Sequence, residues 1–203
     1  FMFSHQDAYV ENTFRDNGAG VAVMYSKQVH MERNTFEKNW GSAAYGILLK
    51  DISDSQILHN RFLKNTVGIF MEGSSRIQVE KNLFQENGWA LKVQASCDDN
   101  NFRNNNFYSN SFDVATNGTM VLNTFSHNYW DKYDGYDRGR DGIGDVAYRP
   151  VSMYSMIVEQ NPTTLILLRS VLITFLDKAE KAIPSLTPEN LIDENPLLSP
   201  NAL

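Results

Sequence analysis

The stretch Asn60-Arg-Phe62-Leu-Lys-Asn65, followed by the alternating run Gly68-Ile69-Phe70-Met71, is one copy of a unit that recurs along the chain. The unit reads Asn-x-Phe-x-x-Asn, and its six copies begin at Asn12, Asn34, Asn60, Asn82, Asn105 and Asn123. The steps between the leading asparagines are 22, 26, 22, 23 and 18 residues, and four extra residues in the stretch 40–45 account for the step of 26. A repeat at a nearly fixed period is typical of solenoids and other repeat architectures.

The spacing and the patterning of the unit together predict its secondary structure. Apolar and polar residues alternate over three or four positions at a time, which indicates short strands with one face inward. A repeat of this length has room for roughly three such strands and three bends, whereas helical repeats need about 34 to 47 residues. We therefore predict an all-β fold, a right-handed parallel β-helix of about six coils over residues 1–128.

Stacking of the coils turns each position of the repeat into a row, and two rows are predicted to lie inside. The residues three before the leading asparagine are Tyr9, Met31, Ile57, Val79, Phe102 and Met120. The residues two after it are Phe14, Phe36, Phe62, Phe84, Phe107 and Phe125. The leading asparagines themselves are predicted to form a buried ladder at a bend, each amide bonding the backbone and its neighbours in adjacent coils.

Composition limits the class of protein. The chain has 203 residues, 42% of them hydrophobic, which is enough for one domain with a sizeable core, alone or with an appendage. The net charge of −6 and the absence of a basic cluster argue against a nucleic-acid partner. A single cysteine, Cys97, excludes an internal disulfide and is expected to be a small buried residue. The chain opens without an initiator Met, so we interpret it as a fragment or a mature segment.

The repeat pattern stops after Asn128, and residues 129–150 are rich in aspartate and glycine. Carboxylate oxygens are the ligands that Ca²⁺ prefers, so Asp137, Asp141 and Asp145 are candidate calcium ligands. Their spacing argues against such a site, because they recur at every fourth position and a dense calcium loop has ligands at every second. The alternative is a loop that caps the hydrophobic end of the stack, with its aspartates bonded to backbone amides. In that case three aromatic side chains would cover the last coil, namely Trp130, Tyr133 and Tyr148.

This segment, coming directly after Asn-x-Phe coils, resembles the C-terminal end of the NosD family. The matching residues are Asn128-Tyr-Trp130, Tyr133-Asp-Gly135, Asp141-Gly-Ile-Gly-Asp145 and Tyr148-Arg-Pro150. Further matches lie in the tail, at Pro162, Ala182-Ile-Pro184, Pro188 and Asn195-Pro-Leu-Leu198. The coils alone are less specific, because they also resemble the β-helix repeats of pectate lyases, polygalacturonases and carbohydrate-binding domains.

The resemblance implies a function. NosD proteins are periplasmic β-helix components of an ABC-type complex that matures the copper enzyme nitrous oxide reductase. It therefore implies a periplasmic, non-enzymatic accessory protein that supplies or presents copper, with this chain as the C-terminal half. The partners implied are the membrane and ATPase subunits of the transporter, a copper chaperone and nitrous oxide reductase.

If the chain handles copper, ligands suited to Cu(I) should be present, and thioether and imidazole groups are of that kind. Met24 follows the inward-facing Val23, and His30 lies between two inward-facing residues, so both are predicted to point outward around one bend. We interpret Met24 and His30 as candidate copper ligands, against the alternative of a solvated histidine and a chance surface methionine. More distant candidates are Met2, His5, His59 and His127.

Two other classes remain open. A carbohydrate-degrading enzyme would need two carboxylates on one outer face. Glu32 and Glu80 lie two coils apart, roughly 10 Å by twice the strand spacing, but Leu58 stands between them and no aromatic or arginine row flanks them. The third class is a scaffold or a carbohydrate-binding protein that holds no metal.

Residues 151–203 are predicted to form a linker and a helical tail. Asn161-Pro162 reads as an N-cap with proline at the first helical position, and the helix should stop before Pro184. One apolar stripe follows helical spacing, at Leu165, Leu168, Leu172, Phe175, Leu176, Ala179 and Ile183. The apolar stretch is too short and too charged to span a bilayer.

Three roles are open for this helix: covering the β-helix flank, docking a membrane subunit, or lying in the lipid interface. The extra apolar face and the family resemblance favour at least partial use of the tail against a membrane subunit. The partner-binding residues would be Met153, Met156, Leu165, Leu168, Leu172 and Phe175. We also expect that deleting residues 161–203 would leave the β-helix folded.

Overall fold

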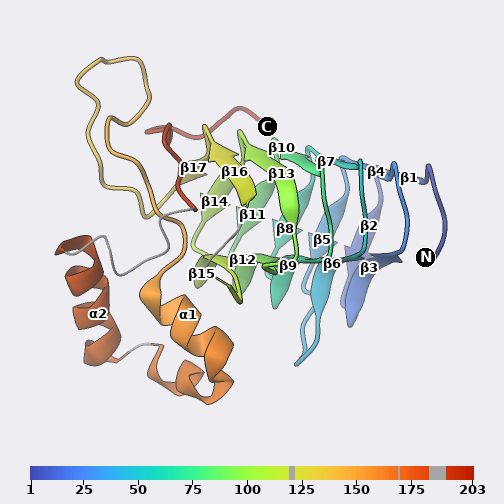
Figure 1. Cartoon of the computed structure of the whole chain (residues 1–203), viewed down its shortest axis with the longest axis horizontal. Helices are drawn as coiled ribbons and strands as arrows, with labels where there is room; N and C mark the ends of the chain where they lie inside the picture. Colours follow the sequence, from blue (N-terminus) through green and yellow to red (C-terminus); the bar gives the residue numbers. More distant parts are fainter. Residues whose placement is uncertain (119–121, 169, 183–190) are drawn as a thin grey trace.

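The computed structural model describes residues 1–118, 122–168, 170–182 and 191–203. It is a β-solenoid of stacked parallel strands with a short helical tail near one end, as Figure 1 shows. Five turns contain three strands each, and a sixth turn contributes two more strands. The predicted all-β, parallel β-helix architecture is therefore confirmed.

The strands form three sheets, in which each strand pairs with the equivalent strand of the next coil. The first sheet contains β1 (Ala8–Val10), β4 (His30–Glu32), β7 (Gln56–Leu58), β10 (Gln78–Glu80), β13 (Asp98–Arg103) and β16 (Leu122–Ser126). The second contains β2 (Thr13–Arg15), β5 (Thr35–Glu37), β8 (Arg61–Leu63), β11 (Leu83–Gln85), β14 (Asn106–Tyr108) and β17 (Tyr129–Trp130). The third contains β3 (Ala19–Met24), β6 (Tyr45–Lys50), β9 (Val67–Glu72), β12 (Trp89–Val93) and β15 (Phe112–Ala115).

The asparagine ladder forms as predicted at the bend between the first and second sheets. The side-chain amide of Asn34 donates to Asn60 Oδ1 at 3.0 Å and to the Tyr9 carbonyl at 2.7 Å, and the backbone N–H of Asn34 donates to the same Asn60 oxygen at 2.9 Å. The residue before each asparagine of this ladder has positive φ, for example Arg33 at 53°. Such a backbone is unfavourable for a side chain with a Cβ, so the ladder must stabilise each bend against it.

A second ladder lies at the next bend and is made by the closing asparagines of the unit. Asn65, for example, donates from its side chain to Asn87 Oδ1 at 3.1 Å and to the Phe36 carbonyl at 2.9 Å. The members of this ladder are Asn17, Asn39, Asn65, Asn87 and Asn110. The two ladders satisfy backbone groups that the bends would otherwise bury unpaired.

The sixth copy of the repeat is shifted relative to the prediction. Asn128, not Asn123, accepts from Asn105 and continues the leading ladder. Phe125 consequently pairs with Phe102 of the first sheet, with ring centres 4.7 Å apart, instead of continuing the phenylalanine row of the second sheet. The irregular step of 18 residues was the signal, because the step from Asn105 to Asn128 is 23.

The phenylalanine row runs along the second sheet and ends in a tryptophan. Successive rings from Phe14 to Phe107 are nearly parallel, and Trp130 stacks on Phe107 with ring centres 4.1 Å apart. Met120, predicted for the other interior row, lies outside the described residues, and Phe125 occupies the sixth position of that row. Cys97 is buried in the same core as predicted, and burial raises the pKa of its thiol.

The last coil is closed by residues from the far end of the chain. Asp193 is fully buried, and its Oδ2 accepts from the backbone and side-chain amides of Asn128 at 3.0 Å and from the Trp130 indole at 3.1 Å. Leu197 continues the stack by donating its N–H to the Asn128 carbonyl at 2.9 Å. Deletion of residues 161–203 would remove this cap. The expectation that the β-helix stays folded without this segment is still a prediction.

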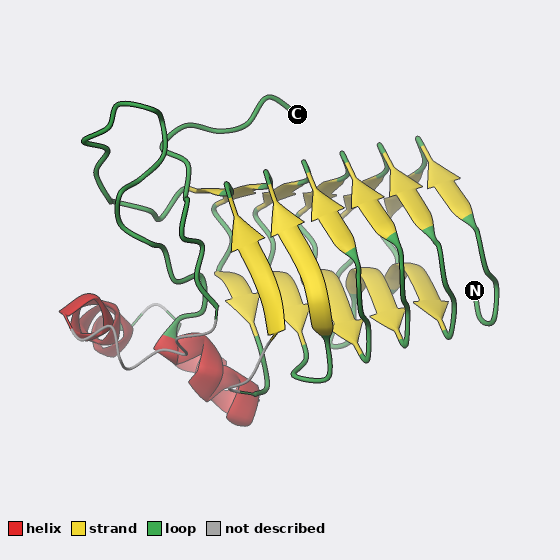
Figure 2. Ribbon diagram, turned by 45° about the horizontal axis from the view of Figure 1, so that its top comes forward, coloured by secondary structure: helices red, strands yellow, loops and turns green. Residues whose placement is uncertain are grey.

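In its described residues the tail contains three short helices instead of one: α1 (Met153–Gln160), the 3-10 helix η1 (Pro162–Leu167) and α2 (Val171–Ala182). The backbone N–H of Asn161 donates to the Ile157 carbonyl, so Asn161 ends α1 before Pro162 starts η1. Ser152 caps the start of α1 by accepting from Ser155 N at 3.1 Å. The predicted stop before Pro184 lies outside the described residues. Figure 2 shows α1 near one end of the strand stack.

Candidate functional site

Met24 and His30, the predicted copper ligands, lie on different sheets of the solenoid. Met24 is the last residue of β3 in the third sheet, and His30 is the first residue of β4 in the first sheet. The bend between them turns at Tyr25 and Gln28, both with positive φ. Both candidate side chains are partly exposed, as their predicted outward orientation requires.

Both ring nitrogens of His30 already face oxygen acceptors. Nδ1 lies 3.2 Å from Gln56 Oε1, and Nε2 lies 3.0 Å from Glu32 Oε2. The hydrogen bond from His30 holds the pKa of the Glu32 carboxyl below its usual range. A lone pair on His30 becomes available to a metal only after one of these hydrogen bonds breaks.

Met24 has a sulfur-bearing neighbour on the adjacent coil, Met2. Met2 and Met24 form a parallel β-bridge, which places their backbones about one strand spacing apart. Met2 is exposed and Met24 partly so, and paired residues of parallel strands project to the same side of a sheet. The two methionines are 22 residues apart, which is the commonest step of the repeat. Their pairing could therefore have been predicted from the period of the repeat.

The three loop aspartates mainly hold their own loop together. Asp137 accepts from the backbone amides of Arg140 and Gly142, the second at 2.9 Å. Asp141 accepts from Ile143 N at 3.0 Å, and Asp145 accepts from Arg138 N. These bonds are those expected of a capping loop, and they engage oxygens that calcium would need.

Tyr133 fixes the shape of this loop. Its hydroxyl donates to the Val146 carbonyl at 2.7 Å. A Cβ added to Gly135 or to Gly144 would lie 2.0 Å from the Tyr133 oxygen, so both positions require glycine. The ring of Tyr148 contacts both Tyr133 and Trp130, with centres 5.9 and 5.1 Å away. The three aromatic residues thus lie together at the end of the stack.

Glu32 and Glu80, the carboxylates considered for an enzyme, both form ion pairs. Glu32 contacts His30 and Arg33, and Glu80 lies 3.9 Å from Arg103. Leu58 separates the two carboxylates in the strand register. Across the described parts of the chain, no three His, Cys, Asp or Glu residues are grouped so that they could hold a metal ion. Methionine sulfur is not among those groups, so the thioether pair stands apart from that finding.

The tail residues predicted to bind a partner divide into two sets. Leu165 and Leu168 pack, together with Leu176, against a small core of Phe112, Tyr154, Val158 and Ile173. Met156 packs against the main core, and Met153 is partly buried. Leu172 and Phe175 are instead 54% and 67% exposed.

These two residues belong to a larger exposed apolar surface, called the tail face below. The tail face consists of Val171, Leu172 and Phe175 of α2. Helical periodicity alone could not distinguish the tail face from the residues that pack inward, because the predicted apolar stripe included residues of both kinds. Among the described helices, none is long and apolar enough to span a membrane.

Comparison with known proteins places the chain in a family. The family model described as periplasmic copper-binding protein (NosD) matches residues 1–135. A probable ABC transporter binding protein NosD of Pseudomonas aeruginosa is 30% identical over 112 residues, which are 54% of this chain and 26% of that relative. The protein of the same description from Stutzerimonas stutzeri is 29% identical over 112 residues, with the same shares. The matched segment spans about a quarter of the length of these two relatives. The family model covers well over half of this chain, so the chain belongs to the NosD family.

Proposed function

We propose that this chain is part of a non-enzymatic accessory protein that works in the periplasm with an ABC transporter and supplies or presents copper for the maturation of nitrous oxide reductase. The family match over residues 1–135 carries this proposal, because the family is described as periplasmic and copper-binding. The names of the two relatives support an association with an ABC transporter.

The thioether pair of Met2 and Met24 supports a site for Cu(I) as cargo. Cu(I) prefers soft ligands, and two neighbouring thioethers on an outer face offer them without the need to deprotonate a ligand. His30 would serve as a third ligand only after release from Glu32 or Gln56. A site with few, exposed ligands suits a protein that passes its metal on, since a closed site would retain it.

The tail face supports a contact with the transporter's membrane subunit. Its three apolar side chains are exposed, although α2 also has an inward side that packs on Phe112 and Tyr154. Solvent-exposed apolar residues that gather on one surface commonly mark interaction sites. On this proposal α1 and η1 hold the helix against the solenoid, and the tail face meets the partner.

Copper binding can be tested by titrating the chain with Cu(I) in competition with bicinchoninate. We expect Met2→Ala and Met24→Ala each to weaken binding by about tenfold or more, and His30→Ala to weaken it less. Met153→Ala serves as the control, because Met153 is a partly buried methionine at the start of α1, outside the coils that carry the pair. Unchanged affinity in both methionine variants would remove this site, and a chain that binds no Cu(I) would favour a metal-free scaffold.

A further inference from the structure

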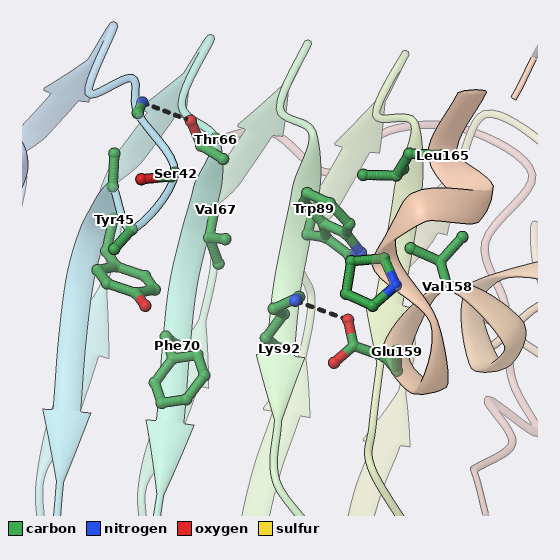
Figure 3. A pocket seen from close by; sticks show the side chains of 14 residues that line it. Ser42, Tyr45, Thr66, Val67, Phe70, Trp89, Lys92, Val158, Glu159 and Leu165 are labelled. Carbon is green, nitrogen blue, oxygen red and sulfur yellow. Dashed lines mark hydrogen bonds and ion pairs between the residues drawn. The ribbon is translucent and has the colours of Figure 1, made fainter.

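A groove of about 320 Å³ lies on the outer surface of the third sheet. One wall is the four-residue insertion that lengthens the second coil, with Gly41 and Ser42, and the other wall is formed by α1 and η1, with Val158 and Leu165, as Figure 3 shows. Gly41 N donates to Thr66 Oγ1 at 3.1 Å, which ties the insertion to the next coil. The insertion therefore has a fixed position beside the sheet.

The floor of the groove is aromatic. Tyr45, Phe70 and Trp89 come from three successive strands, β6, β9 and β12, and their side chains point outward in Figure 3. The rings of Tyr45 and Phe70 have centres 5.3 Å apart. Because each strand is about 4.8 Å from the next, the floor extends along the stack for about two strand spacings. Tyr45 and Phe70 offer apolar ring faces to a ligand, whereas the Trp89 ring also stacks on Phe112, with ring centres 5.4 Å apart.

Polar groups in the groove are balanced in charge. Lys92 Nζ lies 2.6 Å from Glu159 Oε1 and 4.4 Å from the centre of the Trp89 ring. Both side chains are mostly buried, at 19% and 13% exposed. An ammonium group carries three N–H donors and a carboxylate carries two oxygens, so the pair presents donors and acceptors side by side without a net charge.

The floor of the groove also contains an unpaired donor. The indole nitrogen of Trp89 is buried and has no hydrogen-bond partner among the described residues. Buried polar groups are almost always satisfied in folded proteins, so an unpaired one beside a groove marks a place where an acceptor is missing.

We propose that this groove binds a neutral saccharide. Sugar rings present apolar C–H faces that pack on aromatic rings, and their hydroxyls both donate and accept, as the Lys92–Glu159 pair requires. Among the described residues that line the groove, Glu159 is the one carboxylate, and glycoside hydrolysis normally requires two. The groove therefore binds its ligand without cleaving it, and this role is independent of copper.

The test is calorimetric titration of the full chain with a panel of neutral trisaccharides: cellotriose, xylotriose, mannotriose and chitotriose. We expect saturable binding of at least one, weakened by about tenfold or more in Tyr45→Ala and Phe70→Ala, which corresponds to the loss of one good contact. Ser42→Trp should block the groove by adding bulk to an exposed loop without removing any floor residue. Tyr136→Ala, which changes an exposed aromatic side chain of the capping loop, should bind as the unaltered chain does.

Three results would overturn the proposal. One is the absence of saturable binding of every trisaccharide, and another is equal binding by Tyr45→Ala, Ser42→Trp and the unaltered chain. The third is binding of the tripeptide Leu-Trp-Leu in the groove without any sugar binding, which would make it a peptide site. Circular dichroism and thermal unfolding of each variant distinguish lost contacts from lost folding.

Discussion

The coil stack of residues 1–130 and the segments that follow it are held together in different ways. In the stack, each position is repeated one coil away, so an asparagine or a phenylalanine is supported by equivalent residues above and below. Among the described residues after 130, single residues make contacts that are not repeated from coil to coil, such as those of Asp193 at the end of the leading ladder. The same kind of substitution should therefore have different consequences in the two regions.

The largest effect is expected in the middle of the phenylalanine row. Phe62 is fully buried between Phe36 and Phe84, with ring centres 5.0 and 4.8 Å away. Replacing it in Phe62→Ala should lower the free energy of unfolding by about 3–5 kcal/mol, through lost burial and the cavity left behind. Chemical denaturation measures this, with Phe175→Ala in the exposed tail face as the control. A loss below about 1 kcal/mol would contradict stacking of the row inside the core.

The cap should be nearly as sensitive, although it is one residue. Asp193→Ala would leave the Asn128 amides and the Trp130 indole buried without an acceptor. We expect a loss of about 2–3 kcal/mol in the free energy of unfolding, because unsatisfied buried donors are costly. Asp193→Asn keeps an acceptor oxygen and should cost less. Equal stability of Asp193→Ala and the unaltered chain would mean that the last coil closes without this cap.

Repetition also explains which features could be predicted from the sequence. The repeated unit allowed the asparagine ladder and the interior rows to be predicted. The sixth copy was placed wrongly, because Asn123-x-Phe125 also matches the unit although the ladder continues at Asn128. Asp193 could not be found by period, since 65 residues separate it from the asparagine that it caps. The Met2–Met24 pair follows from the repeat, whereas the groove needs α1 and η1 to pack on the third sheet.

A smaller and pH-dependent effect is expected at the junction of the two regions. Asp113 of β15 is buried beside Lys132 of the capping loop, 3.1 Å away. Burial raises the pKa of the Asp113 carboxyl, and the nearby Lys132 ammonium opposes this only in part. The folded state therefore holds the proton of Asp113 more tightly than the unfolded state does. The stability that comes from the protonated carboxyl is lost as the pH rises from about 4 through the raised pKa.

The matched variant is Asp113→Asn, which has nearly the same shape and does not titrate. The difference in unfolding free energy between the unaltered chain and Asp113→Asn should become less favourable to the unaltered chain as the pH rises over that range. Denaturation at a series of pH values measures this difference, and the many shared carboxylates cancel from it. A difference that is constant with pH, or that changes in the opposite direction, would contradict a raised pKa at Asp113.

The smallest effect on stability is expected at the tail face, where the effect on binding should be large. Leu172 and Phe175 are exposed, so the double variant Leu172→Ser, Phe175→Ser should change the free energy of unfolding by no more than about 0.5 kcal/mol. If the tail face docks the transporter, the same variant should no longer co-purify with co-expressed membrane and ATPase subunits. Leu122→Ser is the control, because Leu122 is an equally exposed apolar residue on β16, within the coil stack. Retained co-purification of the double variant would refute docking by the tail face, and loss with Leu122→Ser as well would show that the coil stack contributes to the contact.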